Sequence, residues 1–181
     1  ILEQVTYTSE MVDYLIKLSK VQAMEANKSK FDLRELLQKV ITQYKITLQN
    51  NHLHVRNNLD SIEHFGIEED ISQMEIVFHN LISNAIKYGE EDYFEILLTN
   101  DRDNELKCTI KNKTTRVQQE HLTHIWDSFY VIEESRNKAF SGTGLGLSIV
   151  ATILDENELS YEVKLEDSYI SFSIWFHLNQ F

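Results

Sequence analysis

The sequence predicts an α/β fold of the α+β kind: a two-layer sandwich with a mixed, mostly antiparallel sheet, helices on one face and a long helix in front. Two observations support this prediction. Four segments in the second half alternate apolar and polar residues, as strands with one buried face do. Other segments repeat apolar residues every three or four positions, as amphipathic helices do. The length of 181 residues fits one full domain plus an appendage.

Four main helices are expected. Residues 1–28 carry an apolar stripe that needs a partner, either the chain's own domain or another helix in a coiled-coil-like pair. A second helix covers residues 31–48, with Asp32 as N-cap and Glu35 in the capping-box position. A third helix covers residues 71–88, with one apolar face made of Ile71, Met74, Phe78, Leu81, Ile82 and Ala85. The fourth runs from about residue 145 to residue 155, and a short helix is expected within residues 117–129.

The strand candidates follow from alternation. A short strand is expected within residues 53–58, two longer ones at 93–99 and 105–111, and a closing hairpin at 159–167 and 169–178. Between the short helix and the last helix lies a long polar loop, residues 130–144. Loops of this length in a compact domain are usually functional or disordered.

The stretch SGTGLGLSIV, residues 141–150, holds three of the chain's five glycines. A glycine-rich turn that opens a helix directs free N–H groups and the positive end of the helix dipole outward, which favours an anion. The stretch lacks the Gly-Lys-Ser/Thr ending of a Walker loop and the glycine spacing of a dinucleotide fingerprint. A flexible hinge between loop and helix is the alternative interpretation.

The stretch HNLISNAIKYG, residues 79–89, places three polar residues on one helix face. Asn80, Asn84 and Lys87 lie at i, i+4 and i+7, beside the apolar face of the same helix. Asparagine oxygens can coordinate Mg²⁺ and lysine can bind a phosphate, although a solvated helix face gives the same pattern. Combined with the glycine-rich helix start and the long loop, this face favours a nucleoside triphosphate with its metal.

At this point the sequence resembles sensor histidine kinases. DISQMEIVFHNLISNAIKYG is similar to their N-box region, and IWDSFYVIEESRNKAFSGTGLGLSIV is similar to their F-box, ATP lid and second glycine box. Order and spacing agree over residues 31–181. The resemblance implies the Bergerat ATP-binding fold, with ATP and Mg²⁺ as ligands.

The resemblance also implies roles for individual residues. Asn84 is expected to hold Mg²⁺, Asn80 to support the phosphates or the metal, and Lys87 to meet phosphate oxygens. These three are the residues expected to carry phosphoryl transfer. Tyr88 is expected to flank the nucleotide.

Further residues are assigned to the base and the lid in the same way. Val117 and Ile125 are expected to line the adenine pocket, and Phe129 to anchor the lid. Arg136 is expected to reach the phosphates. The glycine box, in which the glycines let the lid hinge and the helix end approach the phosphates, comprises Gly142, Thr143, Gly144, Leu145 and Gly146.

One part of the chain departs from the family pattern. After the strand at 105–111 the family has an aspartate followed by glycines two and four residues later, whereas this chain reads NKTTRV. Asn112 takes the aspartate position, and Thr114 and Arg116 take the glycine positions. Asn112 can still accept a hydrogen bond from the adenine amino group, but without a charge. We therefore expect a different backbone path and a reduced affinity for adenine nucleotides.

A second departure concerns the phosphoacceptor. None of the chain's seven histidines lies in the H-box context of the family, and His79 sits inside the N-box helix. Residues 1–30 resemble the second helix of a dimerisation hairpin, and residues 31–181 the catalytic ATP-binding domain. The expected function is that of a bacterial two-component sensor kinase fragment, which transfers the ATP γ-phosphoryl group to a histidine that this chain lacks.

The resemblance implies partners as well. They are the phosphoacceptor helix of the same kinase, which is a homodimer in the parent protein, and a response regulator. A degenerate Bergerat-fold interaction module with weak or no ATP binding is the alternative, and an ATPase of the chaperone or topoisomerase type is a third possibility. The expected location is the cytoplasmic portion of a membrane-anchored sensor.

The amino-acid composition disfavours or excludes several other classes of protein. The net charge of −12 disfavours a nucleic-acid partner, because phosphate backbones need a basic face. The single cysteine, Cys108, excludes an internal disulfide framework and fits a reducing compartment. No apolar run approaches the ~20 residues of a membrane-spanning helix.

Overall fold

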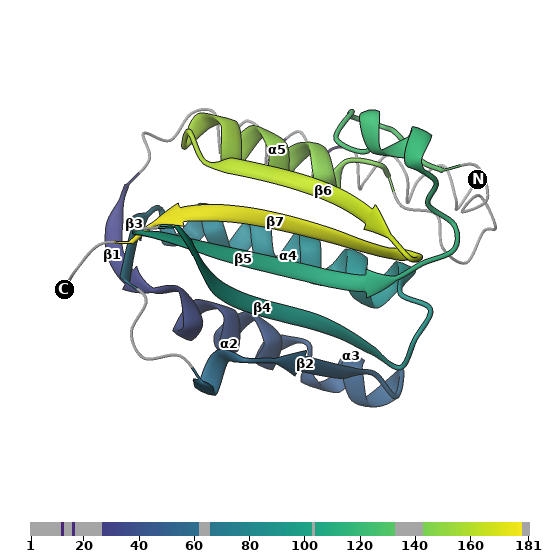
Figure 1. Cartoon of the computed structure of the whole chain (residues 1–181), viewed down its shortest axis with the longest axis horizontal. Coiled ribbons are helices and arrows are strands. Elements are labelled where there is room, and N and C mark those ends of the chain that lie inside the picture. Colours follow the sequence, from purple (N-terminus) through teal and green to yellow (C-terminus); the bar gives the residue numbers. More distant parts are fainter. Residues whose placement is uncertain are drawn as a thin grey trace.

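The computed structural model describes residues 12, 16, 27–61, 66–102, 104–132 and 143–178 (Figure 1). Its helices are α2 (Leu33–Gln43), α3 (Lys45–Asn50), α4 (Ile71–Tyr88) and α5 (Gly146–Glu156), with short 3₁₀ turns at Leu59–Ser61 and Gln119–Thr123. Its strands are β1 (Ser29–Asp32), β2 (His54–Asn57), β3 (Gly66–Glu69), β4 (Tyr93–Arg102), β5 (Glu105–Lys113), β6 (Ser160–Glu166) and β7 (Tyr169–His177).

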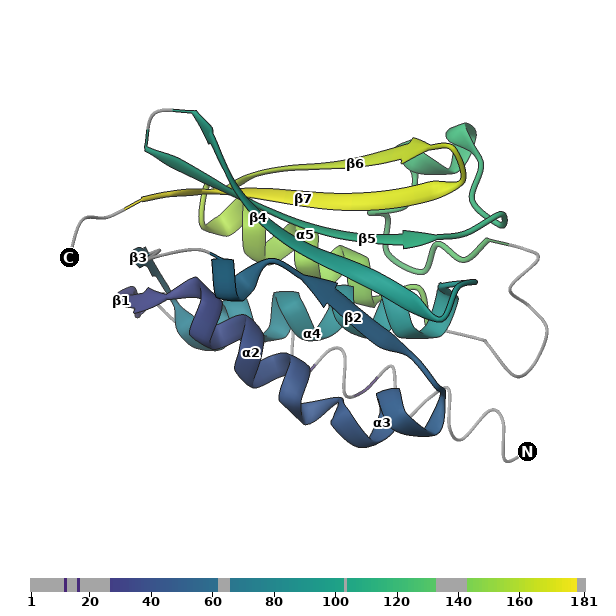
Figure 2. The same cartoon turned by 60° about the horizontal axis from the view of Figure 1, so that its bottom comes forward.

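Five strands form one mixed sheet in the order β2-β4-β5-β7-β6. β2 runs parallel to β4, and the other neighbours are antiparallel. Figure 2 shows α2, α4 and α5 together on one side of this sheet. The predicted two-layer sandwich with a mostly antiparallel sheet is therefore confirmed.

The core lies between the sheet and the helices. On β5, Leu106, Cys108 and Ile110 alternate inward and are at most 1% exposed. Asn112 and Thr114 continue the same alternation and are also buried. The core-facing side of β5 therefore ends in two polar side chains. Because core faces are normally apolar, their position marks a place where the layer between sheet and helices becomes polar.

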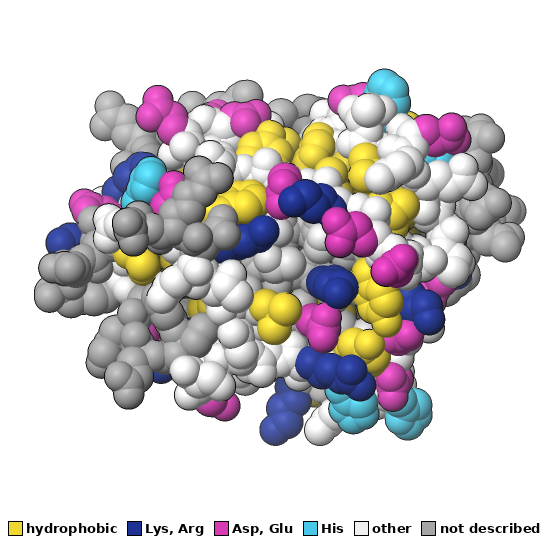
Figure 3. All heavy atoms as spheres, viewed as in Figure 1, with side chains coloured by type: hydrophobic (Ala, Val, Ile, Leu, Met, Phe, Trp, Pro, Cys, Tyr) yellow, Lys and Arg dark blue, Asp and Glu magenta, His cyan; other side chains and the backbone are white. Residues whose placement is uncertain are grey.

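The other face of the sheet, turned toward the viewer in Figure 1, has no covering helix among the described residues, and lysine, arginine and acidic side chains are mixed on it (Figure 3). Lys107 lies 3.6 Å from Glu162, Lys111 lies 3.8 Å from Glu95, and Lys113 lies 3.0 Å from a carboxylate oxygen of Glu91. This mixture of signs is typical of a solvated sheet face.

Helix α4 begins and ends where the sequence predicted. Asp70 caps its first turn by accepting hydrogen bonds from the backbone N–H groups of Ser72 and Gln73 at 2.9 and 3.1 Å. The predicted apolar face is buried except at Ile71, which is 43% exposed. Ile71, the first residue of the helix, shares this face by spacing but is not buried with the rest of it.

Residues 31–48 were predicted to form one helix, and the structure shows that this prediction is wrong. Phe31 and Asp32 belong to β1, which pairs antiparallel with β3 in a small second sheet, and the helix that follows is divided at Tyr44 into α2 and α3. The predicted N-cap is confirmed, because Asp32 accepts a hydrogen bond from the backbone N–H of Arg34 at 2.8 Å. The short helix expected within residues 117–129 is limited to a 3₁₀ turn at Gln119–Thr123.

Most of the first 30 residues lie outside the described part of the chain. Val12 and Ile16 are helical, and their side chains are 48% and 47% exposed. The expected long helix and its partner therefore stay predictions. Within the described residues, no helix has both the length and the apolar character needed to cross a bilayer.

Candidate functional site

The carboxyl-terminal half of α4 meets the start of α5. The Asn80 side chain donates from Nδ2 to the carbonyl of Ile76 at 2.8 Å, which turns its Oδ1 away from its own helix. A Cβ atom placed on Gly146 would lie only 2.8 Å from this Oδ1. Only glycine at position 146 therefore allows the first turn of α5 to approach Asn80 so closely.

Asn84, Lys87 and Tyr88 follow Asn80 on α4 and are all half-buried. The Lys87 ammonium lies 5.3 Å from the centroid of the Tyr88 ring. The structure thus brings the predicted polar residues of α4 to the end of the helix that faces α5 and the end of β5. Of these residues, Asn80 is the one that lies directly against a glycine of the predicted box, Gly146.

The base of the long loop is fixed at two residues. The backbone N–H of Phe129 donates to the carbonyl of Gly144 at 2.9 Å. Gly144 has φ +68°, and a Cβ there would come within 2.7 Å of backbone atoms of Phe129 and Tyr130. Phe129 itself has φ +66°, an uncommon conformation for a bulky residue, and is 50% exposed. This backbone hydrogen bond therefore brings Phe129 and Gly144 together at the two ends of the long loop, and we call this pair the lid stem.

The remaining residues of the predicted glycine box and lid are not partners in the hydrogen bond between Phe129 and Gly144. Leu145 is buried in the core at 2% exposure, and Thr143 is half-buried next to Gly144. Arg136 and Gly142 lie outside the described residues, so their expected roles stay predictions.

Asn112 lies against the end of α4. It is 4% exposed, and its Nδ2 donates to the carbonyl of Lys113 at 3.3 Å. A Cβ on Gly89, which ends α4, would lie 3.7 Å from the Asn112 Cβ. The residue at the aspartate position therefore lies on the helix-covered side of the sheet, near the end of the helix that carries Asn84 and Lys87.

Val117 and Ile125 are both near the core. Ile125 is 9% exposed, and Val117 is partly buried against the same hydrophobic cluster. Whether they line an adenine pocket stays a prediction.

The loop after β5 does not need glycine. None of the described residues from Asn112 to Val117 has a positive φ, in contrast to Gly144. The backbone N–H of Thr114 donates to the carbonyl of Ser168 at 2.7 Å, which ties the loop to the β6–β7 turn. Sequence reasoning missed a further residue, Glu90, whose carboxylate contacts Thr115 and Arg116. Its position directly after a helix-ending glycine was the available signal.

The side-chain oxygens at this site suit a hard cation such as Mg²⁺, when the phosphates of a bound nucleotide supply part of its coordination. Among the described residues, no three or more His, Cys, Asp or Glu side chains gather into a metal site. Mg²⁺ commonly takes one or two protein oxygens plus substrate phosphates, and the amide oxygens of Asn80 and Asn84 fit this pattern.

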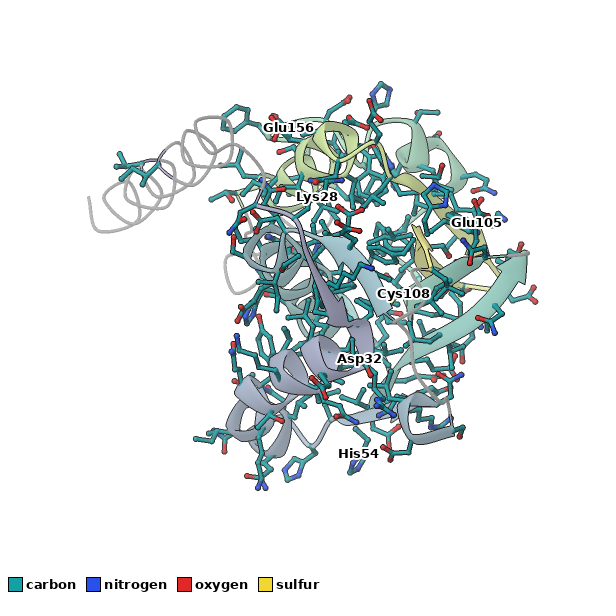
Figure 4. All side chains as sticks on the ribbon, turned by 90° about the vertical axis from the view of Figure 1, so that its left-hand side faces the viewer. Lys28, Asp32, His54, Glu105, Cys108 and Glu156 are labelled. Atoms are coloured by element: carbon teal, nitrogen blue, oxygen red, sulfur yellow. The ribbon has the colours of Figure 1, made fainter. Side chains whose placement is uncertain are left out.

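Cys108 is not part of the chemistry. It points into the layer between sheet and helices (Figure 4), and burial raises the pKa of its thiol to about 12. A thiol with such a pKa is almost fully protonated near pH 7 and is therefore a poor nucleophile.

Comparisons with known proteins agree with this geometry. Sensor protein SrrB of Staphylococcus aureus is 27% identical over 168 residues, covering 92% of this chain and 28% of SrrB. Sensor histidine kinase YkoH of Bacillus subtilis is 27% identical over 162 residues, covering 89% of this chain and 34% of YkoH. The chain therefore spans about a third or less of the length of these relatives.

Solved structures share the fold. The histidine kinase AdeS of Acinetobacter baumannii superposes with a TM-score of 0.74 at 22% identity, over 99% of this chain and 82% of that one. Histidine kinase ThkA in its complex with the response regulator protein TrrA gives a TM-score of 0.78 at 17% identity, over 97% of this chain and 49% of that one. Full-length ShkA in complex with AMPPNP gives 0.79 at 16% identity, over 95% of this chain and 36% of that one.

The match to a protein family covers most of the domain. Residues 69–180 match the family described as histidine kinase-, DNA gyrase B-, and HSP90-like ATPase. This range includes α4, the lid stem, the glycine box and the strands that support them, from β4 to β7. The chain therefore belongs to the histidine kinase-, DNA gyrase B- and HSP90-like ATPase family, and its similarity to sensor histidine kinases confirms the resemblance found in its sequence.

Proposed function

We propose that this chain is the ATP-binding catalytic part of a two-component sensor histidine kinase. It binds ATP with Mg²⁺ and transfers the γ-phosphoryl group to a histidine outside the chain, for relay to a response regulator. The observation that carries this proposal is the approach of Gly146 to Asn80, which joins the helix with the polar face to the glycine-rich helix start. The family membership and the sensor kinases among the relatives support it.

The chain's own residues contribute binding and positioning. Asn84, with Asn80 beside it, would hold Mg²⁺ by amide oxygens, and the ion would offset charge on the phosphates. Lys87 would neutralise phosphate oxygens from the same helix. The first turn of α5 presents the positive end of the helix dipole, which favours an anion. Phosphoryl transfer depends mainly on such positioning and charge stabilisation, so no base is required from this chain.

The partner proposals have separate support. ThkA is seen in complex with a response regulator, and ShkA in complex with a nucleotide analogue. By analogy we infer a response regulator and the phosphoacceptor helix of the same kinase as partners, with the parent protein a membrane-anchored homodimer. Val12 and Ile16, exposed at helical spacing, are consistent with a second helix as partner.

The test is Mg²⁺-dependent nucleotide binding in the variant Asn84→Ala. Wild-type chain should bind ADP in the presence of Mg²⁺ and more weakly without it, measured by calorimetry. Asn84→Ala should lose the Mg²⁺-dependent part, because the metal loses its protein ligand, while the thermal unfolding midpoint stays near that of wild type. Asn50→Ala, at the exposed end of α3, is the matched control and should bind as wild type does.

One observation favours a second function. Asn112, Thr114 and Arg116 replace the family's aspartate and glycines, which supports an interaction module with little ATP binding. The same titration separates the two candidates. Absence of ADP binding to the wild-type chain, with or without Mg²⁺, would favour the interaction module.

A further inference from the structure

Glu90 connects the end of α4 to the loop that follows β5. Its backbone N–H donates to the carbonyl of Lys113 at 3.0 Å. Its carboxylate accepts from the backbone N–H of Thr115 at 2.9 Å and from the Thr115 hydroxyl at 2.9 and 3.1 Å. The Arg116 Nε lies 3.4 Å from the same carboxylate. Glu90 therefore contacts the last residue of β5, Lys113, and two residues of the loop that follows, Thr115 and Arg116.

These contacts occur where the chain lacks glycines. Thr114 and Arg116 have backbone conformations open to any residue, so the loop is not shaped by a positive-φ turn. Its course is determined by Glu90 on one side and by the carbonyl of Ser168, which accepts from Thr114, on the other. Glu90 is an exposed residue whose side chain keeps 24% of its surface accessible, so water partly screens its hydrogen bonds to Thr115.

The connection joins the two halves of the nucleotide site. Glu90 comes directly after Gly89, which ends the helix that carries Asn84 and Lys87, and the loop it contacts begins directly after Asn112. The loop also meets the lid stem, because Arg116 lines a pocket of about 230 Å³ together with Tyr130, Val131 and Ile132. Binding a whole nucleotide requires a fixed distance between the groups that hold the base and those that hold the phosphates.

We infer that Glu90 is a positioning residue for recognition of the adenine base. Its carboxylate holds Thr115 and Arg116, and its backbone N–H holds the carbonyl of Lys113, which keeps Asn112 oriented toward the base while the phosphates lie on α4 and α5. The inference rests on the proposed function, since it assigns a role within the same ATP site. In this chain the Glu90 side chain would fix the course of the loop. In the family pattern, with glycines two and four residues after the aspartate, glycine backbone would do this.

A matched control lies next in the sequence. Glu91 also binds the start of this loop, through an ion pair of 3.0 Å with Lys113, and it accepts hydrogen bonds from Tyr169 at 3.2 Å. These contacts belong to the uncovered face of the sheet, opposite Asn112. Glu91→Gln therefore removes a comparable carboxylate without touching Thr115 or Arg116.

The test compares a whole nucleotide with a ligand that has no base. Glu90→Gln should weaken Mg²⁺·ADP binding about fivefold, roughly the worth of one neutral hydrogen bond, because the amide keeps an acceptor oxygen but loses the charge. It should leave the affinity for Mg²⁺·tripolyphosphate unchanged, measured by calorimetry or by competition. Glu91→Gln should change neither affinity. Thr115→Val should resemble Glu90→Gln, whereas Thr115→Ser, which keeps the hydroxyl, should resemble wild type.

Two outcomes would overturn the inference. One is an unchanged ADP affinity in Glu90→Gln. The other is an equal loss for ADP and tripolyphosphate, which would mean that Glu90 only stabilises the domain. In phosphorylation of an acceptor fragment, the inference requires a higher KM for ATP in Glu90→Gln with kcat within about twofold. Failure of the proposed function can be told apart from failure of this inference, because in the first case the wild-type chain itself would bind no ADP.

Discussion

At the scale of single residues, the proposed ATP site gives Asn112 the task of accepting a hydrogen bond from the adenine amino group. A carboxylate acceptor makes hydrogen bonds roughly twice as strong as a neutral amide does. Asn112 is 4% exposed, so the difference is not screened by water. In the nucleotide-free domain, burial acts in the opposite direction. An ionised side chain at position 112 would lose its hydration there, which lowers the free energy of unfolding.

Asn112→Asp should therefore tighten ADP binding, by no more than about tenfold, while lowering the stability of the nucleotide-free domain. GDP should gain nothing, since guanine has a carbonyl where adenine has its amino group. The measurement is calorimetric affinity for ADP and GDP in both proteins, with thermal unfolding as a second readout. An equal gain for both nucleotides would mean that residue 112 does not face the adenine amino group.

At the scale of elements, the two glycines next to the lid have different tasks. Gly144 needs its positive φ and its close contact with the backbone of Phe129 and Tyr130, so its requirement is structural. Gly146 is helical, and the nearest obstacle to a Cβ is the side-chain oxygen of Asn80, which can move. The first glycine therefore shapes the lid stem, and the second leaves space for a functional side chain.

Alanine substitution should separate these tasks. Gly144→Ala should lower the free energy of unfolding by at least about 2 kcal/mol, because it combines a left-handed backbone with a steric overlap. Gly146→Ala should change it by less than about 1 kcal/mol, since alanine favours helix, yet it should weaken Mg²⁺·ADP binding by displacing Asn80. Urea unfolding and calorimetry on both variants test this, and wild-type ADP affinity in Gly146→Ala would contradict the role of the Asn80 contact.

The start of α4 gives a pH-dependent prediction. Burial alone would raise the pKa of Asp70, but hydrogen bonds from the Ser72 side chain and from the backbone N–H groups of Asn27, Gln73 and Ser72 outweigh it and lower the pKa. A carboxylate with a lowered folded-state pKa stabilises the fold fully above its unfolded pKa, and this contribution is lost as the pH falls through the folded value.

Asp70→Ala should thus cost about 1–2 kcal/mol at pH 7, the usual effect of removing an N-cap. The difference from wild type should shrink below about pH 4, where the wild-type carboxyl becomes protonated. Urea unfolding at several pH values measures it, with Asp92→Ala, an exposed carboxyl, as the control. A difference that does not depend on pH would contradict an ionised cap.

The long elements were predictable from sequence, and the short ones were not. α4 was predicted with its observed ends from its apolar period, and the structure shows an Asp70 cap and Gly89 at those ends. β1 and β3 have four residues each and pair only with one another, so neither shows a usable alternation. Within the site, Asn80, Asn84 and Lys87 followed from helical spacing. Glu90 could not be found in this way, since its partners Thr115 and Arg116 are 25 and 26 positions further along the chain.

At the scale of the whole molecule, the proposed function places the donor site and the acceptor histidine in different parts of the phosphotransfer system. The described domain contains the elements that we propose to bind the nucleotide, and none of its histidines has the sequence context expected of an acceptor. His79 is the nearest in sequence to the site, but its Nδ1 lies 3.2 Å from the Tyr44 hydroxyl and its Nε2 lies 4.0 Å from Glu75. These contacts direct the ring toward α2, and a nucleophilic imidazole needs a free nitrogen in line with the γ-phosphate.

The chain incubated alone with γ-labelled ATP and Mg²⁺ should therefore acquire no acid-labile phosphate. Added to a separate dimerisation fragment that carries the acceptor histidine, it should label that fragment, because positioning of the nucleotide is the donor's main contribution. Asn84→Ala should abolish this transfer, and Asn50→Ala should not. Stable acid-labile label on the isolated wild-type chain would contradict the division of roles. Loss of that label in His79→Asn would then identify His79 as the acceptor and α4 as both donor and acceptor element.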